Sequence, residues 1–297
     1  MSGLEHIQNV AVLGAGTMGA GIAQVAAQCG YDTCLYDIEE EYVARGRKGI
    51  VAMLDKGVAR GKVTEDVREQ TLDRLRTSTV IAEAVAGAHV VIEAAPEDLA
   101  LKRRIFGEVA KHVGTDCLLA TNTSSLSVTQ IAESVPSPTR FLGMHFFNPP
   151  PLMKLLELVR GEQTSEECMQ LAREFSIALG KDPIVVKDSP GFASSRLGLV
   201  LGLEAIRMVE EGVASAEDID KAMELGYRHP MGPLKLTDLV GLDVRLAIAT
   251  YLAETIDDRR FTPPALLEAL VEQGKCGKKS GEGFYLWEDG KPVPKPL

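Results

Sequence analysis

His145 and Glu157 are the residues of this chain whose types and spacing most clearly predict chemistry. They lie at equal distances on either side of Pro151, in two apolar runs joined by a proline-rich turn. If these runs are neighbouring strands, the connection is too short for a parallel crossover, so the strands are antiparallel and the two residues face each other. A carboxylate fixes the tautomer of a histidine and stabilises its imidazolium, which makes a general base near neutral pH. The alternative is a core histidine and a solvated carboxylate.

A glycine-rich turn near the N-terminus predicts a nucleotide site. It joins a strand-like run ending at Leu13 to a helical run, and reads Gly14-Ala-Gly16-Thr-Met-Gly19. Gly14 allows the tight turn, Gly16 lets the backbone approach a pyrophosphate, and Gly19 lets the helix pack on the strand. Asp37 ends the next strand-like run, where a carboxylate accepts from a ribose 2′-hydroxyl and repels a 2′-phosphate. The pattern therefore favours NAD over NADP.

Two alternatives concern the same segment. The turn could belong to a Rossmann-like fold that binds another ligand or none, with Asp37 as a solvated carboxylate at a strand end. Strand, turn, helix and acid all agree with a dinucleotide, which favours that interpretation. Gly21 adds a second Gly-x-Gly, and we interpret it as a packing glycine.

Short polar side chains follow two further strand-like runs. Asn122-Thr-Ser124-Ser125 comes directly after one run, and Glu97 comes after another. In an open α/β sheet, ligands lie beyond the carboxyl ends of the strands, so these side chains would point into a cofactor crevice. An ordinary turn with a helix cap explains the same residues, and the sequence leaves both interpretations open.

Composition excludes several classes of protein. The chain has 297 residues, 45% of them hydrophobic, and a net charge of -10, which argues against a nucleic-acid partner and an anionic membrane surface. The five cysteines form no CxxC pair and no metal-ligand spacing with the five histidines, so we expect reduced thiols and no metal site. No run approaches the ~18 apolar residues of a membrane span, and the N-terminus leaves no room for a leader. We expect a cytoplasmic protein.

The elements that position these residues differ between the two halves of the chain. Over residues 1–186, short β-type runs alternate with helical patterns, which predicts a Rossmann-type doubly wound α/β domain with a mostly parallel sheet. Residues 187–297 read as an all-α domain, with a capping box at Ser215-Ala-Glu-Asp218 and a single strand at Gly283-Phe284-Tyr285-Leu286. Residues 197–209 are too apolar for a one-sided surface helix, which predicts burial between domains or subunits and a homo-oligomer.

The chain resembles the L-3-hydroxyacyl-CoA dehydrogenase family over nearly its whole length. The segments that carry the resemblance are GAGTMGAGIAQ, LYD, EAAPED, ATNTSSL, GMHFFNPPPLMKLLELV, KDSPGF, EAIRMVEEG, EDIDKAMELGYRHPMGP, DLVGLD and GKKSGEGFY. The resemblance implies a Rossmann domain joined to a helical domain that dimerises, and NAD-linked oxidation of a 3-hydroxyacyl-CoA or the reverse reaction.

Position by position, the resemblance implies roles for single residues. His145 matches the catalytic base, Glu157 its orienting carboxylate, and Ser124 the serine that bonds the substrate oxygen. Ser195 stands where the family usually has a substrate-holding asparagine. A hydroxyl can still donate to a carbonyl, but it has a shorter reach and one donor instead of two. The residues expected to contact NAD are Gly14, Gly16, Thr17, Met18, Gly19, Asp37, Ala94, Glu97, Lys102, Asn122, Ser124, Asn148 and Lys279.

A basic stretch between Arg45 and Lys62 offers charges for the CoA phosphates, which an acidic protein must bind locally. The resemblance implies CoA contacts along this predicted helix. Lys56 and Arg60 are spaced i,i+4 and share a helix face, so we predict that they bind CoA. The alternative is a solvated basic face that balances nearby acids.

The expected activity is the NAD-dependent interconversion of an (S)-3-hydroxyacyl-CoA and the 3-ketoacyl-CoA by a homodimer. A short chain, as in 3-hydroxybutyryl-CoA, is favoured. Two alternatives remain: a dehydrogenase of a non-CoA 3-hydroxy acid on the same scaffold, and a noncatalytic NAD-binding structural protein.

Overall fold

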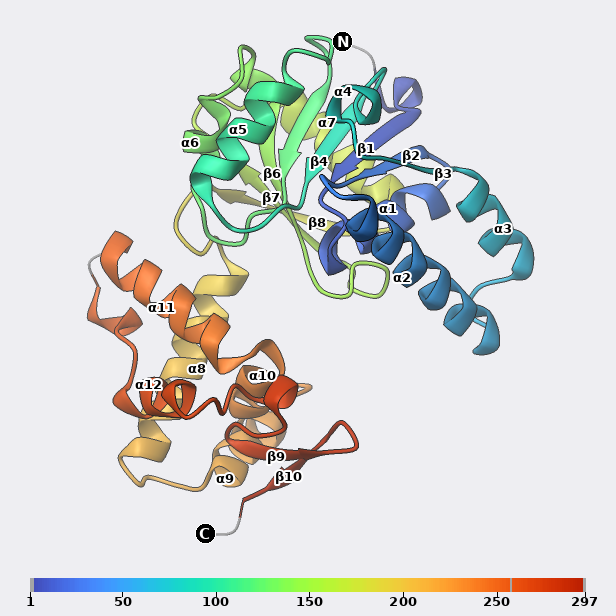
Figure 1. The fold of residues 1–297 in the computed structure, drawn as a ribbon. Coiled ribbons are helices and arrows are strands. Elements are labelled where there is room, and N and C mark those ends of the chain that lie inside the picture. Colours follow the sequence, from blue (N-terminus) through green and yellow to red (C-terminus); the bar gives the residue numbers. More distant parts are fainter. Residues whose placement is uncertain (1–2, 257, 296–297) are drawn as a thin grey trace. The chain divides into compact units, whose positions relative to one another are not determined.

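Parallel strands form the centre of the first unit of the chain (Figure 1). The computed structural model describes residues 3–256 and 258–295. The strands of the main sheet are β1 Asn9–Leu13, β2 Asp32–Tyr36, β3 Leu75–Ser78, β4 Val90–Glu93, β5 Leu118–Thr121, β6 Phe141–Phe146, β7 Leu155–Arg160 and β8 Asp182–Lys187. Within the described residues their order is β3-β2-β1-β4-β5-β6-β7-β8. Neighbouring strands are parallel, except that β7 is antiparallel to β6.

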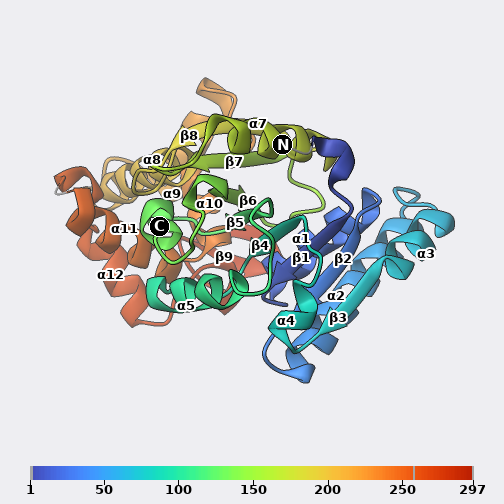
Figure 2. The ribbon, with the colours of Figure 1, turned by 90° about the horizontal axis from the view of Figure 1, so that it is seen from above.

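Helices cover both faces of this sheet. They are α1 Thr17–Gln28, α2 Glu40–Ala59, α3 Glu65–Asp73, α4 Ile81–Ala84, α5 Leu99–Val109, α6 Val128–Ala132 and α7 Glu166–Ala178, with 3-10 turns at Leu4–His6 and Pro138–Arg140. Residues of α1, α2 and α7 share one apolar core with the strands, in which the rings of Tyr31 and Phe175 meet edge to face at 5.1 Å. Phe106 of α5 meets Phe141 at 4.6 Å, and α5 and α7 lie on opposite faces of the sheet (Figure 2).

The predicted Rossmann-type fold is confirmed, and the apolar runs expected to be strands all lie in the main sheet. The sequence did not predict β3, because only Leu75 of its four residues is buried and Arg76 is exposed at the sheet edge. The domain boundary expected from the sequence, between residues 186 and 187, would separate Lys187 from the rest of β8. The first unit extends to Ser189 and the second begins at Pro190.

The second unit is helical apart from one hairpin. Its helices are α8 Ser194–Glu210, α9 Ala216–Lys221, α10 Pro233–Val240, α11 Leu242–Ile256 and α12 Ala265–Glu272, with a π-helical turn at Ala222–Gly226 and 3-10 turns at Arg259–Phe261 and Lys278–Ser280. The predicted cap is confirmed, since the Ser215 hydroxyl accepts from the Asp218 amide at 3.1 Å. The strand expected at residues 283–286 overlaps β9 Tyr285–Glu288. The expectation that the rest is all-α is corrected, because β9 pairs antiparallel with a second strand, β10 Lys291–Pro294. Asp289 and Gly290 join these strands with φ of 48° and 77°, as a two-residue hairpin turn requires.

Helix α8 contains the apolar stretch that suggested burial between domains or subunits. It packs on α9, α10, α11 and α12 of its own unit, where Leu199, Leu203 and Ile206 are buried. Packing inside the unit therefore accounts for these residues. Leu197 is 72% exposed.

None of the helices in the described part of the chain combines the length and the apolar character needed to cross a bilayer.

Candidate active site

Residues with candidate chemistry gather at one edge of the main sheet. Gly14 follows β1, Asp37 follows β2, Ala94 follows β4 and Asn122 follows β5, while His145 is the next-to-last residue of β6. These five strands are parallel neighbours, so their carboxyl ends meet at the same edge. The strand order reverses between β1 and β4, which is where ligands bind in open α/β sheets.

His145 and Glu157 form a buried pair across β6 and β7. The antiparallel register places His145 opposite Glu157, as predicted. The His145 Nδ1 atom lies 2.8 Å from Glu157 Oε2, and the two side chains are 9% and 0% exposed. Asn122 Oδ1 accepts a hydrogen bond of 2.8 Å from the amide of Phe146, which fixes the backbone next to His145. Glu157 thus fixes one nitrogen of the imidazole, an arrangement that suits a general base.

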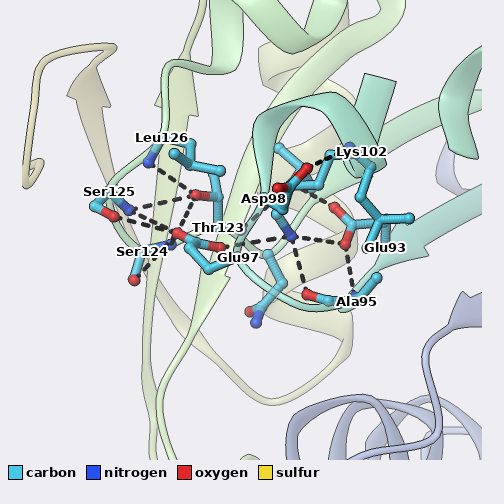
Figure 3. Close-up of polar contacts among 12 residues, drawn as sticks. Glu93, Ala95, Glu97, Asp98, Lys102, Thr123, Ser124, Ser125 and Leu126 are labelled. Carbon is cyan, nitrogen blue, oxygen red and sulfur yellow. Dashed lines mark hydrogen bonds and ion pairs between the residues drawn. The ribbon is translucent and has the colours of Figure 1, made fainter. Parts of the chain in front are cut away.

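Glu97 anchors the turn that carries Ser124 (Figure 3). Its Oε1 atom accepts hydrogen bonds from Thr123 Oγ1 at 2.6 Å, from the Ser124 amide at 3.0 Å and from Ser125 Oγ at 3.2 Å. Burial disfavours its charge, but Lys102 and these hydrogen bonds outweigh that effect and hold the pKa of Glu97 below its usual value. The conformation of the turn therefore depends on an ionised Glu97.

Lys102 lies between two glutamates behind this turn (Figure 3). Its Nζ atom is 2.7 Å from Glu93 Oε1 and 3.5 Å from Glu97 Oε2, and the side chains of Lys102 and Glu93 are 1% and 0% exposed. Glu93 also accepts from the Ala95 amide at 2.6 Å and from Thr121 Oγ1 at 2.7 Å. Lys102 therefore holds together the loops after β4 and β5, while a contact of Lys102 with NAD stays a prediction.

The lowered pKa of Glu97 predicts a pH dependence of stability. A carboxyl with a depressed pKa in the folded state stabilises the fold above the unfolded value near 4.5, and this contribution is lost as the pH falls through the folded pKa. We expect wild type to be more stable than Glu97→Gln at neutral pH, and the difference to shrink progressively below pH 4.5. Urea unfolding of both proteins across this range measures it. A difference that does not change with pH would contradict the assigned role.

The glycine turn has the geometry that a dinucleotide needs. Gly14 has φ of 103°, and a Cβ atom there would lie 2.6 Å from the carbonyl oxygen of Ala94. A Cβ atom at Gly19 would overlap the Gly14 carbonyl. A Cβ atom at Gly16 would have no other atom within 4 Å. Gly16 is therefore open to a ligand. Gly21 is confirmed as a packing glycine, because its Cβ would lie 2.7 Å from Pro150 Cδ.

A cavity of about 500 Å³ opens beside this turn. Asp37 lies at the cavity, and its Oδ2 atom accepts a hydrogen bond of 2.7 Å from the Ala15 amide, which fixes the carboxylate. An apolar cavity with one fixed carboxylate fits the adenosine half of NAD. Of the residues expected to contact NAD, the ones that line it are Gly14, Gly16, Thr17, Met18, Asp37 and Ala94.

A second cavity of about 500 Å³ lies between α1, α2 and the proline-rich loop after β6. It contains Asn148, and it also contains Arg45 and Met53, which sequence reasoning did not select. The sequence feature that could have identified them is the i,i+4 spacing of Arg45, Gly49 and Met53, which puts these residues on one side of α2. Lys56 continues this side beyond the cavity, and Arg60 is the cap residue that follows α2. Neither Lys56 nor Arg60 lines the cavity.

Lys181 fixes the loop between the strands of His145 and Glu157. It is 9% exposed, and its Nζ atom donates to the carbonyl oxygens of Pro150 at 2.5 Å and Met153 at 2.9 Å. Burial lowers the pKa of Lys181, partly offset by Cys29. A lysine after a helix reads as a solvated residue, so no local signal predicts this contact.

Replacing Lys181 with Met should cost about 2 to 4 kcal/mol of unfolding free energy, because a buried hydrogen bond to Pro150 and a partly buried one to Met153 lose their charged donor. Lys187→Met is the matched control, since Lys187 is the exposed last residue of β8, the strand that begins directly after Lys181. It should change stability by less than about 0.5 kcal/mol. Urea unfolding compares the two variants, and equal effects would show that the loop does not depend on Lys181.

Ser195 and Lys279 belong to the second unit. Ser195 is in the first turn of α8. Lys279 pairs with Asp243 at 2.5 Å, and the side chains are 50% and 42% exposed. Their predicted contacts with substrate and NAD stay predictions.

In the described part of the chain, no group of three or more His, Cys, Asp or Glu side chains is placed to hold a metal ion.

Two family models match the chain in succession. The NAD binding domain of 3-hydroxyacyl-CoA dehydrogenase matches residues 9–189, and the C-terminal domain of that enzyme matches residues 191–287.

Individual proteins resemble the chain over most of its length. A 3-hydroxyadipyl-CoA dehydrogenase of Escherichia coli is 45% identical over 95% of this chain, which spans 59% of that longer protein. A probable 3-hydroxybutyryl-CoA dehydrogenase of Deinococcus radiodurans is 44% identical over 93% of this chain and 99% of its own length. The crystal structure of (S)-3-hydroxybutyryl-CoA dehydrogenase from Ralstonia eutropha superposes with a TM-score of 0.91 at 40% identity, covering 95% of this chain and 100% of the other.

Proposed function

This chain belongs to the NAD-dependent 3-hydroxyacyl-CoA dehydrogenase family, and we propose that it interconverts short-chain (S)-3-hydroxyacyl-CoA, above all 3-hydroxybutyryl-CoA, and the 3-ketoacyl-CoA. The buried contact of 2.8 Å between His145 and Glu157 carries the proposal. The pair lies at the sheet edge where the glycine turn also lies, which supports His145 as the general base.

Each residue of the pair has a distinct task in the oxidation. Glu157 engages Nδ1 of His145, so the proton of the 3-hydroxyl group is assigned to Nε2. The carboxylate then stabilises the imidazolium that forms. Ser124, held by Glu97, bonds the substrate oxygen and keeps C3 in place. NAD, when bound, supplies the acceptor for the hydride that leaves C3.

The acyl-CoA is proposed to follow the side of α2 that faces the second cavity. Arg45 and Met53 line this cavity together with the proline-rich loop after His145. Lys56 is exposed three positions beyond Met53, so its charge can meet a CoA phosphate where the cavity ends. Arg60, also exposed, extends the same basic surface.

A turnover series tests the function directly. Purified protein is given 3-hydroxybutyryl-CoA, 3-hydroxyhexanoyl-CoA and 3-hydroxypalmitoyl-CoA with NAD or NADP, and free 3-hydroxybutyrate is included. We expect NADH formation to be fastest with the four-carbon thioester. Turnover of the free acid alone would support a non-CoA dehydrogenase, and no turnover despite bound NAD would support a structural protein.

Asp37→Asn should weaken the choice of NAD over NADP. Asn keeps an oxygen for the Ala15 amide but removes the charge that repels a 2′-phosphate. We expect the ratio of kcat/KM for NAD and NADP to fall by about 10- to 100-fold. Asp32→Asn, at the opposite end of β2, is the matched control and should leave the ratio unchanged. An unchanged ratio in Asp37→Asn would place the cofactor preference elsewhere.

We propose that two copies pair through the second unit as a homodimer. Leu225 and Tyr227 are 80% and 75% exposed, and Leu239 and Val240 of α10 are 45% and 40% exposed. Exposed large apolar side chains support a surface that a partner covers. Light scattering after gel filtration should give twice the mass of the chain, and Tyr227→Glu should lower it. A monomeric wild type would reject this assignment.

A cytoplasmic location is proposed as well. The five cysteines are all free, and Cys34, Cys117 and Cys168 are buried, which suits a reducing compartment. Cell fractionation with an antibody against the chain tests this location, and recovery in a membrane or secreted fraction would contradict it.

A further inference from the structure

Gln24 of α1 is a buried amide with an unpaired oxygen. It is 3% exposed, and the other buried residues of this helix are glycine, alanine, isoleucine and valine. Its Nε2 atom donates to Gln28 Oε1 at 3.1 Å. Across residues 3–256 and 258–295 the Oε1 atom of Gln24 accepts no hydrogen bond, and it is not one of the unpaired atoms that the protein covers completely. This oxygen is therefore open to the space beside the helix.

That space is the cavity between α1, α2 and the proline-rich loop after β6. Gln24 lines it in one stripe of α1 with Thr17 and Gly21, and the whole lining belongs to the first unit. On the α2 side, a Cβ atom at Gly49 would meet no atom within 4 Å, so the cavity is open there. A buried carboxamide that lacks a partner is costly. The cavity therefore suits a ligand that carries hydrogen-bonding groups among apolar carbons.

The cavity lies between two places that the proposed function gives to one acyl-CoA. Asn148 lines it at the loop that follows His145, and Lys56 continues the same side of α2 beyond Met53. The part of CoA between the thioester and the phosphates is the pantetheine arm, an apolar chain with two amide groups. Each amide has a donor and an acceptor, so the Gln24 carboxamide finds a partner with either of its ends. A long acyl chain in the same space would leave Gln24 unpaired.

We propose that Gln24 binds an amide of the pantetheine arm and so favours CoA thioesters over thioesters without the arm. The inference rests on the proposed function, in which the acyl-CoA follows this side of α2. The arm is remote from C3, so the contact adds binding energy to the substrate without taking part in the hydride transfer. Loss of the contact should lower kcat/KM only for substrates that carry the arm.

Two thioesters with the same acyl group test the proposal. The kcat/KM values for 3-hydroxybutyryl-CoA and for the S-propyl thioester of 3-hydroxybutyrate, which has no amide, are measured with NAD for wild type, Gln24→Met and Gln28→Met. We expect Gln24→Met to lower the ratio of the first value to the second by about 5- to 10-fold, as for one lost neutral hydrogen bond. Gln28→Met is the matched control, because it removes the partner of Gln24 Nε2 but keeps the Gln24 carboxamide. Its ratio should be unchanged.

A second variant tests the path of the arm without a change in α1. Gly49 is exposed at the cavity, and leucine favours a helix more than glycine does, so Gly49→Leu should fold. Its side chain occupies the space proposed for the arm. We expect the KM for 3-hydroxybutyryl-CoA to rise by about tenfold or more, while the Kd for NADH in a fluorescence titration stays unchanged.

The outcomes separate this inference from the proposed function. An unchanged ratio in Gln24→Met, or an equal loss of kcat/KM for both thioesters, overturns the contact with the arm. An unchanged KM in Gly49→Leu overturns the path through the cavity. Both results leave the proposed dehydrogenase activity in place. No turnover of any CoA thioester by wild type overturns the proposed function itself.

Discussion

His145→Gln is expected to lower kcat by about 10²- to 10⁴-fold, the usual contribution of a positioned general base. Gln keeps a polar side chain of similar length opposite Glu157, but it cannot take up a proton. The glycine turn and Asp37 are unchanged, so NAD affinity should stay within about threefold of wild type. Steady-state oxidation of 3-hydroxybutyryl-CoA and fluorescence titration with NADH measure the two quantities separately.

His112→Gln is the matched control for this variant. His112 follows α5, and its Nε2 atom makes an exposed contact of 3.1 Å with Glu108. It is not part of the pair on β6 and β7. Its replacement should leave kcat unchanged. If His145→Gln keeps wild-type turnover, the general base is another residue. If NADH binding is lost together with turnover, the variant has disturbed the fold and Glu157→Gln becomes the cleaner test.

Local patterns predicted the parts of the site that short sequence segments determine. The turn between His145 and Glu157 is short enough to impose an antiparallel register, and β6 and β7 have that register. The glycine turn was predictable for the same reason, because positive φ at Gly14 and close contact at Gly19 leave few other residues possible. Neither inference needed any knowledge of distant contacts.

Contacts between distant segments were not predictable in this way. Lys102 and Lys181 both read as solvated lysines, because a lysine is rarely fully buried and nothing adjacent in sequence marks its partners. The partners come from other elements: Glu93 is the last residue of β4, and Pro150 lies in the loop between β6 and β7. The missed hairpin is different, because Asp289-Gly290 is a strong local turn signal.

Lys102→Met should be the most destabilising single change at the site, with a loss of about 3 to 5 kcal/mol of unfolding free energy. The substitution keeps the length of the side chain but leaves Glu93, which is 0% exposed, without a cation. Glu93 still accepts from Ala95 and Thr121, and these hydrogen bonds do not replace a charge. Urea unfolding measures the loss, and Lys111→Met, which removes an exposed partner of Glu108, should cost less than about 1 kcal/mol.

A double variant separates the buried charge from the packing around it. Glu93→Gln combined with Lys102→Met removes both charges, so it should recover a large part of the stability that Lys102→Met loses. Turnover should not recover with it. Lys102 also lies 3.5 Å from Glu97, and Glu97 holds the turn that carries Ser124. If the double variant is no more stable than Lys102→Met, the lysine acts through the packing of its methylene chain, and the charge of Glu93 is tolerated by its remaining hydrogen bonds.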